Sequence, residues 1–519
     1  MARDPASTDD TRFPSSVYRD TVLAPLFETT KREFAAGLYA INEAHGVMLA
    51  ETGILEKADV GRILAAHDRI VAETDLAALA YDGTVEDLFF HVERELKRRL
   101  GAELGGRLHV GRSRNDMDHT LFKMRLKEKT DGLWQALAQL VARLLDKAQA
   151  EAGTVIVAFT HGQPAQPTTL GHFLCAVAEM LLRDGERLAA AYDGLDECPM
   201  GAAAITTTGF PVDRERVAEL LGFARVKENA YGCIAAIDYA MAVYAALKIL
   251  FIDIGRVVQE LGHWTQFETR QLYVPNDLVQ ISSIMPQKRN PVPVEHMRLM
   301  ASLGAGRADA IVDTMRNTPF MDMNDGEGEV QASGFAAFDT ADRLIALFAA
   351  FVEGVAVDDA AVADLVDRSC ITLTELADSL VREEGLAFRE GHEIAAAVSR
   401  AVTAAGGRLS ALGYETFARV FAETTGRQPG IDEAAFRRFV SADHFIAVRD
   451  RRGGPAPAAL AASIEGYRRT LASLERRRAA HRQRMTEAGT RRRGAVAALV
   501  DAAPSPSAAP SSTHSSAAG

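Results

Sequence analysis

The segment 238–264 constrains the fold of this chain most strongly. Its apolar residues recur at spacings of three and four, and the helix that this period predicts is about 40 Å long at 1.5 Å per residue. They occupy more than one stripe of the helix surface, so the helix must be buried on several sides. Because the bundle of one chain rarely covers such a helix, we expect long helices from different subunits to share a core. The apolar residues are Met241, Tyr244, Ala245, Leu247, Leu250, Phe251, Ile254, Val257, Val258 and Leu261.

Helical periodicity also dominates the rest of the sequence, and segments typical of strands are nearly absent. The chain has 519 residues of which 48% are hydrophobic, which is ample for a large core. The sequence therefore predicts an all-α protein, and Ser/Ala/Pro-rich ends that cannot bury enough apolar area to fold. The expected organisation is a disordered N-terminus (1–16), an N-terminal helical domain (17–115), a central helical bundle (116–366), a C-terminal helical domain (367–502) and a disordered tail (503–519).

The overall charge of the chain bears on its partners. A formal net charge of -12 argues against a surface built to neutralise phosphates, so we expect no nucleic-acid partner. The arginine-rich stretch 465–493 has two interpretations, a nucleic-acid-binding arm or the solvated face of a terminal helix beside Glu465 and Glu475. The mixture of charges favours the solvated face.

The sequence also predicts a cytoplasmic protein. Its N-terminus carries acidic residues early, which fits neither a secretory signal nor a transit peptide. No segment approaches 20 apolar residues without a charge or proline, so we expect no membrane association. The cysteines lie far apart with no CxxC pair, and we expect reduced thiols at Cys175, Cys198, Cys233 and Cys370.

Three dense polar clusters are the candidates for chemistry: LHVGRSRND at 108–116, FTHGQPAQPTTLGH at 159–172, and SSIMPQKRNP at 282–291 followed by VPVEHMR. Each has a structural explanation when taken alone. The residues 113–115 could cap a helix that starts near Asp116, His161 could be a core histidine, and 282–291 could be an ordinary connection. Together, however, they supply two anion-binding clusters, an imidazole and a hydroxyl-bearing loop in a chain that is otherwise an apolar bundle.

The clusters resemble the motifs of a known superfamily. The loop 282–291, with Glu295 beyond it, resembles the GSSxMPxKxNP signature of the fumarase/aspartase superfamily. The other two clusters resemble the LHTGRSRND and THLQRAQP stretches of its argininosuccinate lyase branch. Further matches are AHGVMLAETGIL at 44–55, FPVDRERVAELLGF at 210–223 and EGLAFREGHE at 384–393, so the resemblance covers roughly 20–500.

This resemblance implies a fold, an assembly and a reaction. Members have an all-α, three-segment fold whose long helices form a twenty-helix core in a homotetramer, and each active site takes its motifs from three subunits. They release fumarate from a substituted succinate by anti elimination. Removal of a proton from the CH₂ next to a carboxylate spreads negative charge into that carboxylate, giving an aci-carboxylate intermediate that hydrogen-bond donors must stabilise. The SRND stretch favours cleavage of a C–N bond, hence an N-substituted aspartate as the substrate.

The resemblance also assigns roles to individual residues. Ser282 is the expected base, with Ser283 as the alternative, and Lys288 and Asn290 are the expected donors to the aci-carboxylate. His161 is expected to protonate the leaving amine or to hold a carboxylate, with Glu295 orienting its ring. The remaining residues expected to bind the succinate carboxylates and the rest of the substrate are Ser113, Arg114, Asn115, Thr160 and Gln287.

The amine half of the site departs from the branch. Lys31 falls where argininosuccinate lyases carry an aspartate that faces the guanidinium, and Phe89 replaces a histidine. Asp322, Glu327 and Val330 replace a tyrosine, a glutamine and a lysine. A guanidinium beside Lys31 would meet like charge, at a cost of roughly 1 kcal/mol in a partly dry pocket. We therefore treat Lys31, Asp322 and Phe89 as specificity candidates.

Several functions remain open from the sequence. The leading one is a lyase for an N-substituted aspartate other than argininosuccinate, such as the substrate of ethylenediamine-disuccinate lyase; argininosuccinate lyase itself is the alternative. A catalytically silent structural homologue is disfavoured because Ser282, Lys288 and His161 are all present. We expect no cofactor and no metal, since the elimination needs only acid, base and anion binding. The acidic run 322–329 is interpreted as a solvated loop.

Overall fold

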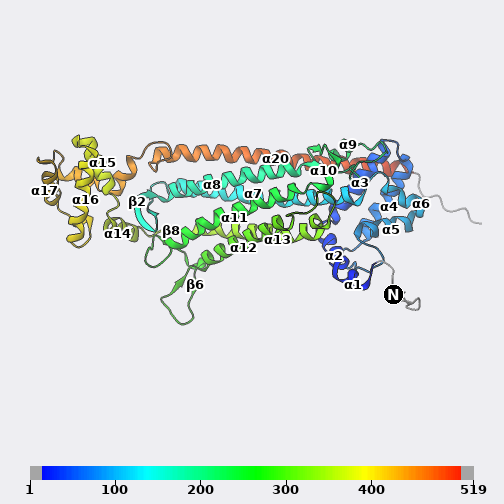
Figure 1. Ribbon diagram of the computed structural model, residues 1–519, viewed down its shortest axis with the longest axis horizontal. Coiled ribbons are helices and arrows are strands. Elements are labelled where there is room, and N and C mark those ends of the chain that lie inside the picture. The colour runs from blue at the N-terminus through cyan, green and yellow to red at the C-terminus, as the bar shows by residue number, and fades with distance from the viewer. Residues whose placement is uncertain (1–13, 504–519) are drawn as a thin grey trace, which may run out of the picture.

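The computed structural model describes residues 14–503 and consists mainly of long helices aligned with its longest axis (Figure 1). The expected termini 1–16 and 503–519 lie almost entirely outside the described residues. Short elements gather at one end of the long helices. They are α1 (Ser16–Tyr18), the π-helix η1 (Arg19–Leu23), α2 (Ala24–Glu33), α3 (Ala35–Glu51), α4 (Lys57–Glu73), α5 (Leu88–Leu100), α6 (Ala102–Gly106) and the 3-10 helix η2 (Arg107–His109).

Five long helices form the central bundle. Helix α11 packs against α12 and α8, α7 packs against α8 and α13, and α12 packs against α13. Their buried apolar faces belong to one core that also includes residues of α3, α4, α5 and α20. The bundle helices are α7 (Arg114–Ala150), α8 (Leu170–Leu195), α11 (Asp238–Trp264), α12 (Val292–Thr314) and α13 (Gly328–Gly354), with α9 (Arg214–Leu221) and α10 (Ala230–Ala235) between α8 and α11.

A second, smaller core lies beyond the other end of the bundle. It is built from apolar residues between 373 and 439, and the aromatic rings of Phe417 and Phe436 stack at its centre with centroids 4.5 Å apart. Its elements are α15 (Leu373–Glu384), α16 (Phe388–Ala404), η5 (Leu409–Ala411), α17 (Tyr414–Thr425) and α18 (Glu433–Phe439). Helix α14 (Asp359–Ser369) packs against β1 and β2, and α19 (Ala442–Ala447) packs against β2.

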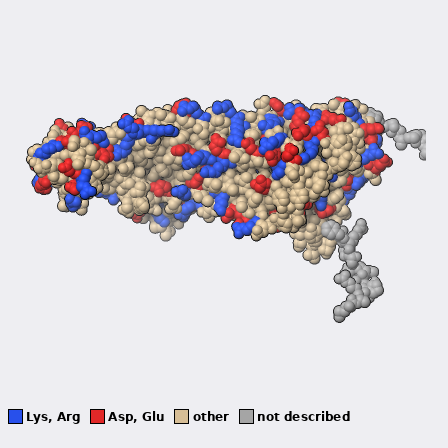
Figure 2. Space-filling model, turned by 45° about the horizontal axis from the view of Figure 1, so that its top comes forward, with Lys and Arg blue, Asp and Glu red and all other residues tan. Residues whose placement is uncertain are grey.

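The last helix, α20 (Pro457–Ala502), runs from this smaller core back along the whole bundle to the N-terminal elements (Figure 1). It packs against α4, α7, α8 and α9. The expected solvated face of the arginine-rich stretch is only part of its surface, because Arg478 pairs with Asp131 at 2.9 Å and Arg492 pairs with Glu43 at 2.8 Å. Figure 2 shows Lys and Arg interspersed with Asp and Glu over one face of the molecule.

The strands within residues 14–503 are short and pair only two at a time. The antiparallel hairpin of β1 (Val155–Thr160) and β2 (Gln163–Thr169) follows α7, and the antiparallel pair β6 (Gln280–Ile281) and β7 (Arg289–Asn290) precedes α12. The other strands are β3 (Glu197–Cys198), β4 (Arg225–Val226), β5 (Leu272–Tyr273) and β8 (Ala356–Val357). Two 3-10 helices, η3 (Asn276–Leu278) and η4 (Asn324–Gly326), lie in the connections.

Several sequence predictions can be compared directly with this architecture. Helix α11 has the predicted bounds, 238–264. The four cysteines are free thiols, and three of them are buried. No helix among the described residues is long and apolar enough to cross a membrane. Apolar side chains on the outer face of the α11–α12 pair remain exposed within the single chain: Ile249, Ile252, Leu299 and Leu303.

Candidate active site

The N-terminus of α7 is built around a capping box. The Ser113 side chain accepts a hydrogen bond from the backbone of the first turn, and the Ser113 N–H donates to Asp116 Oδ1 at 2.9 Å. The helix therefore begins at Arg114, two residues before the position expected from the sequence. Asn115 Nδ2 donates to the carbonyl of Ala204 at 3.1 Å. A capped helix N-terminus of this kind favours anionic groups, because its backbone N–H groups and dipole point toward them.

Asp116 binds the loop that contains Gly201 and Ala203 to this end of the helix. Its Oδ2 accepts hydrogen bonds from the backbone N–H groups of Gly201 and Ala203, both at 2.9 Å. Burial raises the pKa of Asp116 to about 6, although these hydrogen bonds act in the opposite direction. The loop is strained, since Ala203 and Thr207 adopt positive φ values of 50° and 67°. Asp116 is therefore a structural residue that positions the loop beside Asn115.

Arg114 is already paired within the chain. Its Nη1 lies 2.8 Å from Asp87 Oδ2 and 3.2 Å from Glu86 Oε1, and the guanidinium lies over the ring of Phe90 at 5.3 Å. The side chain is nevertheless 38% exposed. Since a guanidinium carries five N–H donors in a planar fork, donors remain for a substrate carboxylate.

Besides Glu86, four carboxylates lie near Arg114, and we call these four the acidic cluster: Asp87, Asp118, Asp322 and Glu327. Burial raises the pKa of Asp118 well above its usual value, and the nearby charges of Glu327, Asp87 and Asp322 raise it further. Burial also raises the pKa of Asp322 and of Glu327, the latter with a contribution from Asp322. Neighbouring carboxylates thus contribute to the raised pKa of Asp118 and Glu327, while Arg114 acts in the opposite direction. A further positive charge placed here would stabilise the ionised carboxylates.

The other two specificity candidates, Lys31 and Phe89, are largely buried and have partners within the chain. The Lys31 side chain is only 7% exposed; its Nζ donates to the carbonyl of Leu79 at 2.5 Å and pairs with Glu28 at 2.9 Å. Phe89 is buried and packs edge-on against Phe90, with ring centroids 5.1 Å apart. The charge of Lys31 is thus balanced inside the chain.

His161 stands at the tip of the β1–β2 hairpin. His161 and Gly162 form the two-residue turn, with φ values of 53° and 73°, as expected for a hairpin turn of the type that needs two positive φ angles. Thr160 and His161 are exposed, so His161 is not a core histidine. The hairpin therefore projects the imidazole away from its own core.

The loop 282–290 is a short hairpin that projects from the bundle near β6 (Figure 1). The Ser282 Oγ accepts hydrogen bonds from the backbone N–H groups of Met285, at 3.0 Å, and Ile284, at 3.4 Å. Asn290 Nδ2 donates to the carbonyl of Gln280 at 3.1 Å, which closes the hairpin. The residues carried by the loop are largely exposed: Ser283, Gln287 and Lys288.

Within one chain the predicted site residues fall into two groups. Helix α7 has 37 residues and is about 55 Å long, with Ser113, Arg114 and Asn115 at its start and the β1–β2 hairpin directly after its end. The first group, Ser113, Arg114 and Asn115, lies at the start of α7 near the acidic cluster. The second group comprises Thr160, His161, the 282–290 loop and Glu295, an exposed residue in the first turn of α12. Figure 1 shows β2 and β6 at the same end of the bundle, opposite α3 and α5.

Two members of the acidic cluster were not singled out from the sequence. Asp87 caps α5, where its side chain accepts a hydrogen bond from the Phe90 N–H at 3.0 Å, and Asp118 lies in the first turns of α7. The sequence offered a weak indication of each residue. Asp118 follows the SRND motif by two residues, in SRNDMD, and Asp87 belongs to an acidic pair, Glu86–Asp87, next to an apolar run. Their convergence on Arg114 depends on tertiary packing.

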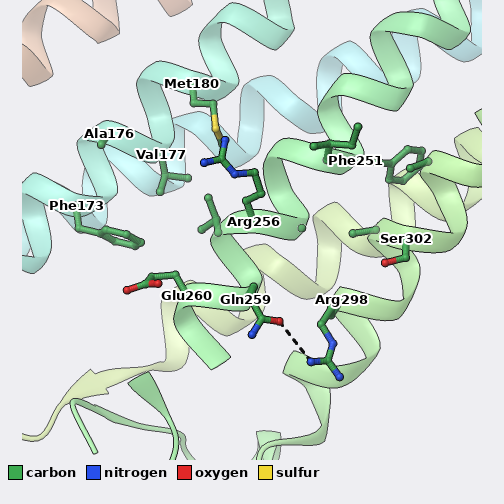
Figure 3. A pocket seen from close by; sticks show the side chains of 15 residues that line it. Phe173, Ala176, Val177, Met180, Phe251, Arg256, Gln259, Glu260, Arg298 and Ser302 are labelled. Atoms are coloured by element: carbon green, nitrogen blue, oxygen red, sulfur yellow. Dashed lines mark hydrogen bonds between the residues drawn. The ribbon is translucent and has the colours of Figure 1, made fainter. Parts of the chain in front are cut away.

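A separate groove of about 800 Å³ lies between α8, α11 and α12. Phe173, Val177 and Met180 face it from α8, and Arg256, Gln259 and Glu260 face it from α11 (Figure 3). Arg298 of α12 donates to Gln259 at 3.4 Å across its floor. The groove is lined by none of the predicted site residues. It lies on the same apolar side of the bundle as the exposed Ile252.

Known proteins resemble this chain over most of its length. Residues 29–303 match the family described as Lyase, and residues 370–447 match the family described as Argininosuccinate lyase C-terminal. The chain is 52% identical to argininosuccinate lyase 2 of Agrobacterium fabrum over 471 residues, covering 91% of this chain and 94% of the relative. It is 37% identical to argininosuccinate lyase of Methanoculleus marisnigri over 436 residues, covering 83% and 86%.

Solved structures of the fumarase/aspartase superfamily have a similar fold. The crystal structure of EDDS lyase in complex with formate has a TM-score of 0.79 and 26% identity, and the match covers 92% of this chain and 96% of that one. A class II fumarase from Schistosoma mansoni shares the fold at a TM-score of 0.64 and 15% identity, over 83% and 92% of the two chains. The all-α, fumarase/aspartase-like fold expected from the sequence is therefore confirmed. This chain belongs to the fumarase/aspartase superfamily, as an argininosuccinate lyase-like member.

Proposed function

We propose that this protein is a carbon–nitrogen lyase that releases fumarate from an N-substituted aspartate whose leaving amine is positively charged. The observation that carries the proposal is the acidic cluster beside Arg114 at the capped N-terminus of α7. It offers a guanidinium and helix N–H groups to a succinate carboxylate, and Asp118, Asp322 and Glu327 to a cation a short distance away. A substrate that carries a succinate carboxylate and, next to it, a positively charged group can bind to Arg114 and to the acidic cluster together.

The elimination starts with loss of a proton from the CH₂ next to a carboxylate. Ser282 takes this proton. Its Oγ already accepts hydrogen bonds from two backbone N–H groups, and such donors favour the deprotonated form of a hydroxyl. Within the described residues the Ser283 side chain makes no hydrogen bond, so Ser282 is the better base. The freed electron pair moves into the carboxylate as the aci-carboxylate.

The next step breaks the C–N bond. Lys288 and Asn290 donate to the aci-carboxylate and hold its charge while the C–N electron pair leaves with the amine. His161 supplies the proton that neutralises the departing nitrogen, and Glu295 orients the imidazole. Ser113, Arg114, Asn115, Thr160 and Gln287 hold the substrate so that the proton and the amine leave from opposite faces. No step needs a metal or an organic cofactor.

We propose that the site is completed by neighbouring subunits in a homotetramer. Arg114 and the β1–β2 hairpin lie at opposite ends of α7, a separation of about 55 Å, so one chain cannot place His161 beside Arg114. The exposed apolar residues Ile252, Leu299 and Leu303 supply a face on α11 and α12 on which further copies can pack. Three subunits would each bring one motif to a site.

The acidic cluster also discriminates between candidate substrates. In argininosuccinate the leaving group carries a guanidinium, which the cluster attracts. In ethylenediamine-disuccinate the leaving group carries a second ammonium and also two carboxylates, so its net charge is more negative and the cluster attracts it less. The sequence suggested that the charge of Lys31 would repel the guanidinium of argininosuccinate. In the structure this charge is balanced by Glu28 and the Leu79 carbonyl. Argininosuccinate is therefore the first candidate substrate, in the cytoplasm, where free cysteines such as these stay reduced.

The test is a fumarate assay followed by ultraviolet absorbance. The purified protein receives argininosuccinate, ethylenediamine-disuccinate and N-methylaspartate, which has no distal charged group. We expect turnover in the order argininosuccinate, then N-methylaspartate, then ethylenediamine-disuccinate. Faster turnover of ethylenediamine-disuccinate would overturn the assignment of a cationic leaving group. Absence of fumarate from all three would contradict the proposal as a whole.

A further inference from the structure

The second cluster of interest lies between α3 and α4, apart from the groups used in catalysis. Among the described residues, Glu43, His67 and Asp68 each place one potential ligand atom within 4.8 Å of the others. Glu43 comes from α3, and His67 and Asp68 come from α4. We propose that these three side chains form a binding site for one divalent transition-metal ion.

The buried imidazole of His67 supports a metal site more strongly than the two carboxylates do. Its side chain is 0% exposed, yet its Nδ1 has no hydrogen-bond partner and lies 3.9 Å from Asp68 Oδ1. A buried polar atom without a partner costs free energy, which a ligand at that atom removes. The T-shaped contact with Tyr39, with ring centroids 5.6 Å apart, packs the imidazole in place.

The other nitrogen of His67 has the neighbour that a metal-bound histidine needs. A metal on Nδ1 requires the proton on Nε2, and a ligating histidine usually donates this proton to an oxygen. The Asn42 amide lies 3.4 Å from Nε2, and its buried Oδ1 has no hydrogen-bond partner. A half-turn of this amide places Oδ1 against Nε2. The Nε2–H then donates to Asn42, and the Nδ1 lone pair is free for the metal.

The donor set identifies the kind of ion. One imidazole nitrogen and two carboxylate oxygens suit Zn²⁺, Co²⁺ or Ni²⁺, whereas Mg²⁺ and Ca²⁺ prefer oxygen ligands alone. The Asp68 side chain is 51% exposed, so water can reach the site and complete the coordination. The ion would tie α3 to α4.

One neighbouring cation opposes the metal and gives the proposal a sharp test. Arg492 of α20 donates to Glu43 Oε2 at 2.8 Å and to the carbonyl of Leu220 at 3.0 Å. Its positive charge competes for Glu43. A metal site therefore predicts that removal of the Arg492 charge tightens binding, whereas a cluster that serves only as a support for Arg492 predicts no binding at all.

The experiment uses the full chain, freed of metal and of any histidine tag, titrated with Zn²⁺ in a calorimeter. We expect one ion per chain. Asp68→Asn and Glu43→Gln should each weaken binding by about tenfold or more, and Arg492→Gln should strengthen it. Glu73→Gln, which removes an exposed acid from the same helix, is the matched control and should bind as the parent does.

Fumarate release by each variant shows that the chain is folded, because none of these residues belongs to the proposed active site. Co²⁺ added in place of Zn²⁺ gives a visible absorption band that should disappear in the His67→Gln variant. Binding of Zn²⁺ with equal affinity to the parent, Asp68→Asn and Glu43→Gln proteins would overturn the proposal. So would the absence of any binding to the parent chain.

Discussion

Replacement of Ser282 by alanine separates the two roles that the structure gives to this hydroxyl. Loss of a general base typically slows turnover by about 10²- to 10⁴-fold. The same change removes the acceptor for the N–H groups of Met285 and Ile284. Because both contacts are exposed to solvent, each contributes about 0.5 kcal/mol, the low end of the usual range. Together they correspond to about a fivefold effect, since 1.4 kcal/mol is about tenfold.

A loss of turnover by about two orders of magnitude or more, as expected for a missing base, therefore cannot come from the weakened loop alone. The matched variant is Ser283→Ala, which removes a neighbouring exposed hydroxyl without a hydrogen bond among the described residues. We expect its turnover to stay within a few fold of the parent. Fumarate absorbance gives the turnover rate, and limited trypsin digestion after the exposed Lys288 and Arg289 reports whether the loop has opened.

Two results would refute the reasoning. One is a Ser282→Ala protein whose turnover falls less than about tenfold, which would show that another group removes the proton. The other is a larger loss in Ser283→Ala than in Ser282→Ala, with unchanged digestion of both loops. That outcome would transfer the base to Ser283.

Three further changes test other parts of the account. Asp322→Asn should raise KM for argininosuccinate about threefold to tenfold through the loss of roughly 1 kcal/mol of attraction, with a smaller effect for N-methylaspartate; equal effects on both substrates would contradict the acidic cluster's role. Asp116→Asn should lower the free energy of unfolding by about 1–3 kcal/mol, since its amide offers only one acceptor oxygen. Burial penalises the ionised form of Asp116 and raises its pKa to about 6, so the free energy of unfolding of the parent is highest below about pH 4 and falls as the pH rises through 6; urea titrations should show this slope in the parent and not in the variant. Gly61→Ala should lower Tm at a cost of about 1–3 kcal/mol, because a Cβ there would lie 2.2 Å from the Leu499 carbonyl oxygen of α20; an unchanged Tm would mean that α20 does not pack there.

The long helices could be predicted from local pattern. Apolar residues recur at helical spacing throughout α11, Asp238–Trp264, so its bounds follow from periodicity. A cap at 113–115 was one of the interpretations open from the sequence for the same reason, because capping depends on neighbours in sequence. The candidate site motifs were found because they resemble motifs of the superfamily and occur in the same order along the chain.

The remaining features depend on partners that are remote in sequence. Arg478 and Arg492 of α20 pair with acids 347 and 449 residues away, and no local pattern reveals this. Lys31 suggested repulsion of a cationic substrate, but its charge is balanced by Glu28 and the Leu79 carbonyl. The acidic cluster likewise draws on three separate segments, at 87, 118 and 322–327, and only the fold brings them to Arg114.

The central claim is that one active site combines residues from different subunits, and complementation tests it most directly. Arg114→Ala and His161→Asn chains are each expected to be inactive, since each lacks one essential motif in every site. After the two are unfolded together and refolded as a mixture, random assembly gives about a quarter of the sites both intact residues. The account predicts that fumarate release returns to about a quarter of the parent rate. Mixed oligomers that form but remain as inactive as the separate variants would contradict it.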